Sequence, residues 1–293
     1  MTMHPLLKIF TLVALLAAGT FLAAMCMIAI AFIQGVDMEV FMQSLLSGEG
    51  EIPQEVLRGM LWVQAIAGFI IPAMAFAWIF YRKQWKSYFR IDKAPSLITL
   101  ILAVIALFAA YPLVQLTFEF NSMLPLPSWM TEMEDSAAEI LRDVLAMESL
   151  GGFLLTLILV AVLPGIGEEL LFRGILQREI TEWTKKPVLS VWIAAIVFSA
   201  IHMQFEGFLP RVALGAVLGF LYLWSNNLWV PIAVHAVNNG TQVAVLYFTG
   251  VDLSAVEEES AMPLNTGIII LSILVLYTCS MLIIKQRDTH HGE

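Results

Sequence analysis

The chain has 293 residues, of which 59% are hydrophobic and only 13% are charged. Soluble domains carry about 25% charged residues, so this composition excludes an ordinary soluble protein. The net charge of −9 includes no long basic block, and nucleic acid is therefore not an expected partner. Both cysteines, Cys26 and Cys279, lie in apolar runs and indicate neither a disulfide framework nor a zinc ribbon.

Eight apolar segments follow one another along the chain. Several reach the ~18–20 residues that cross a bilayer as a helix, and none alternates like the strands of a membrane barrel. The first exceeds the ~7–15 residues of a signal-peptide core, so we predict an uncleaved membrane helix. The sequence thus predicts an all-α polytopic transmembrane helical bundle, a single integral membrane domain over 1–293. The predicted spans are 8–33, 59–81, 96–118, 151–172, 188–203, 211–225, 228–248 and 265–285, of which the fifth and sixth are short.

Basic residues in the connecting segments predict the orientation. Lys and Arg gather in 82–93, in 173–186 and in the tail after Met281. By the positive-inside rule these segments and both termini are cytoplasmic, as in a multi-pass protein of the plasma (inner) membrane. The other loops are poor in Lys and Arg: 34–58 has Arg58, 119–150 has Arg142 and 249–264 has none.

Two outer regions, 36–58 and 128–149, are amphipathic rather than uniformly apolar. We predict short helices at the membrane surface there. They could cap the bundle or gate the access of a substrate.

The stretch "LPGIGEELLFRG" (163–174) places three charges at the end of an apolar run. A charge at a helix centre costs about 2.5–3.5 kcal/mol on insertion scales and is usually functional. Glu169 and Arg173 are four residues apart and can pair. Glu168 is rotated by about 100° and is left to point elsewhere. Pro164 and the two glycines after it are predicted to loosen or kink the helix, giving water and substrate access.

Only two of the five histidines, His202 and His235, lie in apolar segments. Residue 185, in the predicted turn "TKKP", is midway between Glu168 and His202. At 1.5 Å per residue, both would lie roughly 25 Å from that turn, at the same depth. His235 and Asn239 are four residues apart and can face one cavity.

These groups suit the activation of water. Glu168 could take a proton from a water molecule that His202 helps to hold. His235 and Asn239 could then donate hydrogen bonds to the oxyanion. Each residue also has a structural alternative, because intramembrane histidines, amides and ion pairs often join helices.

Three motifs carry a resemblance to a known family. "EELLFR" (168–173), "FSAIH" (198–202) and "HAVNN" (235–239) match E-E-x-x-x-R, F-x-x-x-H and H-x-x-x-N. In this order, on separate apolar spans, they resemble the CPBP intramembrane proteases, which include the type II CAAX prenyl endopeptidases and bacterial Abi-type proteins. The resemblance covers about 150–248, the predicted catalytic core. It implies an eight-helix bundle in the lipid bilayer with a cavity that holds the catalytic groups, and an intramembrane endopeptidase that cleaves a membrane protein or peptide at or near the cytoplasmic side.

The resemblance also implies a role for each motif residue. It makes Glu168 the base, His202 its partner, Glu169 and Arg173 their support, and His235 and Asn239 the oxyanion donors. The family is labelled metalloprotease but has also been described as a metal-independent glutamate type. No H-E-x-x-H helix is present, which favours the second description and no cofactor. Zinc held by Glu168, His202 and His235 is the alternative.

Two other functions stay open. A catalytically silent scaffold or bacteriocin-immunity-type membrane protein could share the fold. A proton-coupled transporter could use Glu168 and the histidines as a relay. Transporters often have paired broken helices in repeated halves, and only one such segment is recognisable here.

Overall fold

The structure is a computed structural model that describes residues 3–47, 52–250 and 265–290. Every regular element in these ranges is helical, which confirms the predicted all-α class. Six helical segments are long and apolar enough to cross a membrane. The protein is therefore a polytopic membrane protein. Pro187–Ala200 is apolar but shorter, so the count of eight spans stays a prediction. Most of the acidic loop 249–264 lies outside the described residues.

The main helices are α1 (Pro5–Ile33), α2 (Met38–Ser47), α3 (Gln54–Val63), α4 (Ile71–Tyr81), α5 (Trp85–Phe89), α6 (Leu97–Ser122), α7 (Ser128–Leu145), α8 (Leu150–Thr156), α9 (Leu163–Glu169), α10 (Arg178–Thr184), α11 (Pro187–Ala200), α12 (Phe208–Ser225), α13 (Trp229–Thr249) and α15 (Thr266–His290). Three π-helical segments, Gln64–Ile70, Leu157–Val162 and Leu170–Gln177, join consecutive helices without a break. One 3₁₀ turn, Arg82–Gln84, lies between α4 and α5, and Arg82 there has φ 45°.

The helix that carries the paired glutamates is longer than its apolar run. It extends from Leu150 to Thr184, whereas the predicted span ended at residue 172 and 173–186 was expected to connect two spans. The polar residues after the apolar run are good helix formers, so the backbone continues until Lys185 adopts a left-handed conformation, φ 58°. The turn predicted around residue 185 is confirmed.

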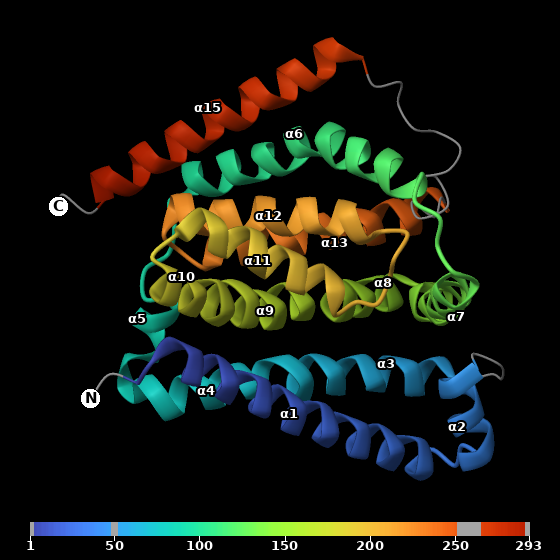
Figure 1. The fold of residues 1–293 in the computed structure, drawn as a ribbon. Helices are drawn as coiled ribbons and strands as arrows, with labels where there is room; N and C mark the ends of the chain where they lie inside the picture. Colours follow the sequence, from blue (N-terminus) through green and yellow to red (C-terminus); the bar gives the residue numbers. More distant parts are fainter. Residues whose placement is uncertain (1–2, 48–51, 251–264, 291–293) are drawn as a thin grey trace.

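The helices form three layers (Figure 1). In the first, α1 packs against α3 and α4; the middle layer contains α8 to α13. In the third, α6 packs on α12 and α13 and is covered by α15. The middle layer contains all three motifs, so the candidate site lies in the centre of the bundle.

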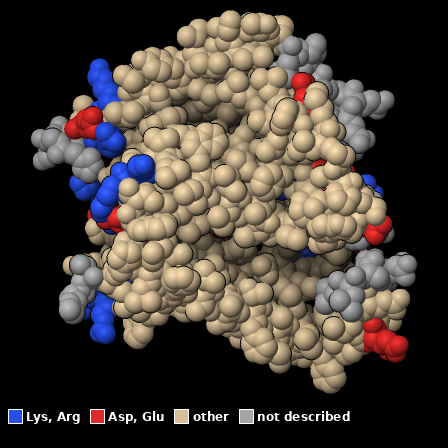
Figure 2. Space-filling model, in the orientation of Figure 1, with Lys and Arg blue, Asp and Glu red and all other residues tan. Residues whose placement is uncertain are grey.

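The two ends of the bundle differ. The predicted amphipathic helices are present as α2 and α7, and both lie at the end opposite the two termini (Figure 1). Most of the Lys and Arg side chains visible in Figure 2 gather at the end with the termini. The basic segments identified in the sequence therefore share one end of the bundle.

Candidate active site

Glu168 and Glu169 end α9, a helical segment between two π-helical segments. The predicted loosening is limited to these π-helical turns, and the backbone stays helical throughout. The glycines allow close packing: a Cβ at Gly165 would lie 3.2 Å from the Ile232 carbonyl oxygen of α13. A Cβ at Gly167 would lie 2.9 Å from the Cβ of Phe69. The sequence of α9 therefore brings the glutamates close to neighbouring helices.

Pro164 creates an acceptor that another helix uses. Proline has no N–H, so the carbonyl four residues earlier, that of Val160, lacks its usual helical donor. The amide nitrogen Nδ2 of Asn239 donates to this carbonyl at 3.0 Å. Asn239 therefore ties α13 to the helix of the glutamates, as the structural alternative for this residue predicts. An amide nitrogen carries two hydrogens, so an oxyanion role stays a prediction.

The predicted ion pair between Glu169 and Arg173 is confirmed. Arg173 Nη1 donates to Glu169 Oε1 at 2.7 Å, and both side chains are buried. Arg173 Nη2 donates to the Gly215 carbonyl of α12 at 2.7 Å. The guanidinium also lies 5.0 Å from the centre of the Phe198 ring of α11. Arg173 therefore joins the helix of the glutamates to α11 and α12.

His235 lies against both glutamates. Its Nδ1 is 2.9 Å from Glu169 Oε1, and its Nε2 is 3.9 Å from Glu168 Oε2. His235 and Glu168 are only 4% and 8% exposed. If Nδ1 donates to the Glu169 carboxylate, Nε2 is the ring nitrogen presented to Glu168 and to any bound substrate.

His202 follows the C-terminal end of α11 and is half-buried. Its Nδ1 lies 2.7 Å from the Phe198 carbonyl oxygen. Among the described residues, no hydrogen bond or ion pair joins His202 to Glu168, so the expected partnership of these two residues stays a prediction. The Phe198 ring contacts both histidines, with centroid separations of 4.9 Å to His202 and 6.2 Å to His235.

Two side chains that sequence reasoning missed position Asn239. Tyr111 of α6 donates its hydroxyl to Asn238 Oδ1 at 3.1 Å. Asn238 Nδ2 in turn donates to Asn239 Oδ1 at 3.0 Å. Asn238 lies within the quoted "HAVNN" stretch, but nothing in the sequence pairs it with a tyrosine 127 residues away.

The proposed zinc ligands do not fit a metal site in this conformation. No group of three or more His, Cys, Asp or Glu side chains in the described part of the chain is arranged to hold a metal ion. The Nδ1 of His235 faces Glu169, and the Nδ1 of His202 faces the Phe198 carbonyl. Each of these contacts uses Nδ1 and leaves Nε2 open, as in histidines that bind metals. In the described residues it is the spacing of the side chains, not these hydrogen bonds, that argues against coordination by Glu168, His202 and His235 together.

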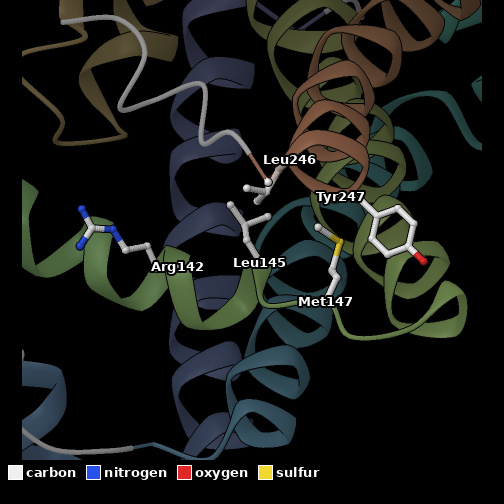
Figure 3. Close-up of a pocket in the computed structure, with 6 residues that line it drawn as sticks. Arg142, Leu145, Met147, Leu246 and Tyr247 are labelled. Carbon is white, nitrogen blue, oxygen red and sulfur yellow. The ribbon is translucent and has the colours of Figure 1, made fainter. Parts of the chain in front are cut away.

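A surface hollow of about 330 Å³ lies away from these groups, at the end with α7. Leu145 and Met147 lie opposite Leu246 and Tyr247 of α13 (Figure 3). Leu246 is 11 residues beyond His235, or roughly 16 Å along the helix. The hollow is therefore separate from the glutamates and histidines.

Comparison with known proteins matches the middle of the chain. Residues 150–241 match the family model "Type II CAAX prenyl endopeptidase Rce1-like", which confirms the resemblance over all three motifs. Two curated proteins of Bacillus subtilis (strain 168) are similar. "Uncharacterized protein YpbD" is 34% identical over 83 residues, 27% of this chain and 39% of that protein. "Putative membrane peptidase YdiL" is 27% identical over 113 residues, 39% of this chain and 46% of that protein.

The chain thus spans less than half the length of the curated relatives it matches. No solved structure matches the chain.

Proposed function

We propose, from the match of residues 150–241 to the type II CAAX prenyl endopeptidase family, that this membrane protein is an intramembrane endopeptidase. The observation that carries the proposal is the contact of one imidazole, His235, with two adjacent buried glutamates. Burying such ionisable side chains inside an apolar bundle costs free energy. A catalytic role would explain why the chain has them there.

Glu168 is the general base. Its carboxylate takes a proton from a water molecule, and the oxygen of that water attacks the carbonyl carbon of the scissile peptide bond. Glu168 Oε2 and His235 Nε2 are 3.9 Å apart, so one water molecule can contact both at about 2.8 Å. Glu168 then passes its proton to the leaving nitrogen as the carbon–nitrogen bond breaks, which restores the carboxylate.

The histidines and Asn239 act on the water and the oxyanion. His202, beside the same Phe198 ring as His235, holds the attacking water. His235 Nε2 and Asn239 Nδ2 donate to the oxyanion. If Nδ1 of His235 donates to the Glu169 carboxylate, His235 must carry a second proton when Nε2 acts as a donor. Glu169 and Arg173 fix the helix and orient the imidazole.

We propose that the reaction needs no metal. The sequence has no H-E-x-x-H helix, and the described residues contain no group of three His, Cys, Asp or Glu side chains arranged to hold a metal ion, so catalysis by the purified protein should withstand a strong chelator. Inhibition by the chelator, with recovery on adding zinc, would instead favour the alternative site of Glu168, His202 and His235.

The substrate is a membrane protein or membrane-bound peptide. The basic end of the bundle supports a cytoplasmic position for both termini in the plasma (inner) membrane (Figure 2). Residues 150–248 form the catalytic core of one integral membrane domain.

The test compares the termini of membrane proteins in cells with wild-type protein, Glu168→Ala or Glu182→Ala at equal levels. Glu182 is the matched control because it is exposed on the same continuous helix. We expect new termini in wild-type and Glu182→Ala cells that are absent with Glu168→Ala. Identical termini in all three strains would reject Glu168-dependent proteolysis and favour the silent scaffold or immunity-type protein.

A further inference from the structure

The turn that carries His202 is irregular. Residues 201–207, named the His202 turn, connect α11 to α12. Met203 has φ 53°, a left-handed conformation that a residue with a side chain adopts rarely. Such a backbone persists only where neighbouring groups hold it. The position of His202 therefore depends on contacts from outside the turn.

Glu134 of α7 supplies one of these contacts. Its two carboxylate oxygens accept hydrogen bonds from two successive backbone N–H groups of the turn. Phe205 N lies 3.0 Å from Oε2, and Glu206 N lies 3.1 Å from Oε1 and 3.0 Å from Oε2. Hydrogen bonds to an ionised carboxylate are about twice as strong as neutral ones. One side chain of a surface helix thus fixes the peptide units three and four residues after His202.

Neutral contacts from α6 and α7 hold the same turn. Asn121 Nδ2 of α6 donates to the carbonyls of Phe205 and Glu206, both at 2.9 Å. The rings of Trp129 and Phe205 meet edge to face, with centroids 5.6 Å apart. The fold of the turn therefore has support that does not depend on Glu134, and removal of the Glu134 carboxylate should shift or loosen the turn without unfolding the bundle.

The other end of α7 is attached separately. Gln54 Nε2 of α3 donates to the carbonyls of Asp143 and Ala146, at 2.7 and 2.8 Å. Arg58 Nη2 also donates to the Ala146 carbonyl, at 3.0 Å. A variant of Glu134 therefore retains the attachment of the C-terminal end of α7.

We propose that Glu134 is a positioning residue of the protease site: its carboxylate fixes the His202 turn, and thereby places His202 beside Phe198 and His235. This role rests on the proposed function. The amphipathic sequence of α7 indicates only that this helix caps the bundle. If Glu134 positions the His202 turn, α7 also controls the geometry of His202, which holds the attacking water.

The test uses the purified full-length protein with Glu134→Ala, Glu134→Gln and the control Asp143→Ala, which removes an exposed carboxylate from the same helix. Hydrogen exchange of peptides covering 201–209 reports the turn. We expect exchange about tenfold faster in Glu134→Ala and a smaller increase in Glu134→Gln, which keeps one acceptor oxygen. With a substrate identified from the terminus comparison, kcat should fall about tenfold in Glu134→Ala with KM little changed. Asp143→Ala should match wild type in both measurements.

The two readouts separate this role from the proposed function. Unchanged exchange in Glu134→Ala would overturn the positioning role, and so would faster exchange with an unchanged kcat. Cleavage by the Glu168→Ala protein at the wild-type rate would instead overturn the proposed function, and the exchange result would still tell whether Glu134 holds the turn. A lower melting temperature with unchanged kcat per folded molecule would show a structural role only.

Discussion

The Nδ1 of His235 lies 2.9 Å from Glu169 Oε1, the oxygen that also accepts from Arg173 at 2.7 Å. Glu169 thus joins the first and third motifs in space, and one carboxylate oxygen orients both the Arg173 guanidinium and the His235 imidazole. Glu168 has a looser contact, 3.9 Å from Nε2 of the same imidazole. The adjacent glutamates therefore differ in environment: Glu169 Oε1 contacts two side chains at hydrogen-bond distance, whereas Glu168 is available to a water molecule.

Glu169→Gln should lower the amount and the thermal stability of folded protein. The substitution removes the charge opposite Arg173, and breaking a buried ion pair costs about 3–5 kcal/mol. Glu168→Gln is the control and should unfold near the wild-type temperature. Thermal unfolding in detergent measures both variants. A wild-type unfolding temperature for Glu169→Gln would refute the supporting role of Glu169.

Sequence reasoning predicted the pairing of Glu169 with Arg173 but not the contacts that His235 makes. The Glu169–Arg173 pair follows from four-residue spacing, and the turn near residue 185 was expected at the "TKKP" stretch between two predicted spans. The contact of His235 with both glutamates was missed, because the predicted partner of Glu168 was His202. Each π-helical segment adds a residue to a helical turn and rotates the later residues of the helix by about 100°. Because π-helical segments flank α9 on both sides, the spacing of an ideal α-helix does not give the directions of side chains across these segments.

The role proposed for Glu134 illustrates a second limit. The amphipathic pattern of residues 128–149 correctly predicted a helix, α7. The pattern contains no information about which backbone groups a carboxylate on that helix reaches. Phe205 and Glu206 are 71 and 72 residues away, and their N–H groups are available only because the turn is irregular. Such contacts depend on the assembled fold rather than on a local motif.

Gly165→Val should reduce activity by moving α13. A Cβ at this position lies 3.2 Å from the Ile232 carbonyl oxygen, so α13 must shift away and take His235 with it. We expect kcat to fall at least about tenfold, with a loss of stability of about 1–3 kcal/mol. Gly151→Val is the control on the same continuous helix, because its nearest neighbouring atom is 3.9 Å from the added Cβ. Equal kcat values for the two variants would argue against this mechanism.

Asn239→Ala and Tyr111→Phe test the oxyanion role. Asn239→Ala removes the bond to the Val160 carbonyl and the proposed donor, so kcat should fall by about 10²–10³. Tyr111→Phe removes only the hydroxyl that orients Asn238, and a few-fold loss is expected. Steady-state kinetics and thermal unfolding should be measured on the same preparations. If Asn239→Ala loses stability but retains kcat per folded molecule, Asn239 only ties the helices.

Glu179→Gln should weaken the bundle at its basic end without changing the chemistry. Glu179 is fully buried and accepts from the hydroxyls of Tyr81 and Tyr88, at 3.0 and 2.9 Å. Lys8 of α1 pairs with the same carboxylate at 3.3 Å. Removing the charge leaves Lys8 without its ionic partner, so the unfolding temperature should fall clearly below that of the control Glu182→Gln. Because Glu179 is 11 residues beyond Glu168, roughly 16 Å along the helix, kcat per folded molecule should stay near wild type. A kcat loss comparable to that of Glu168→Ala would mean that this network takes part in catalysis.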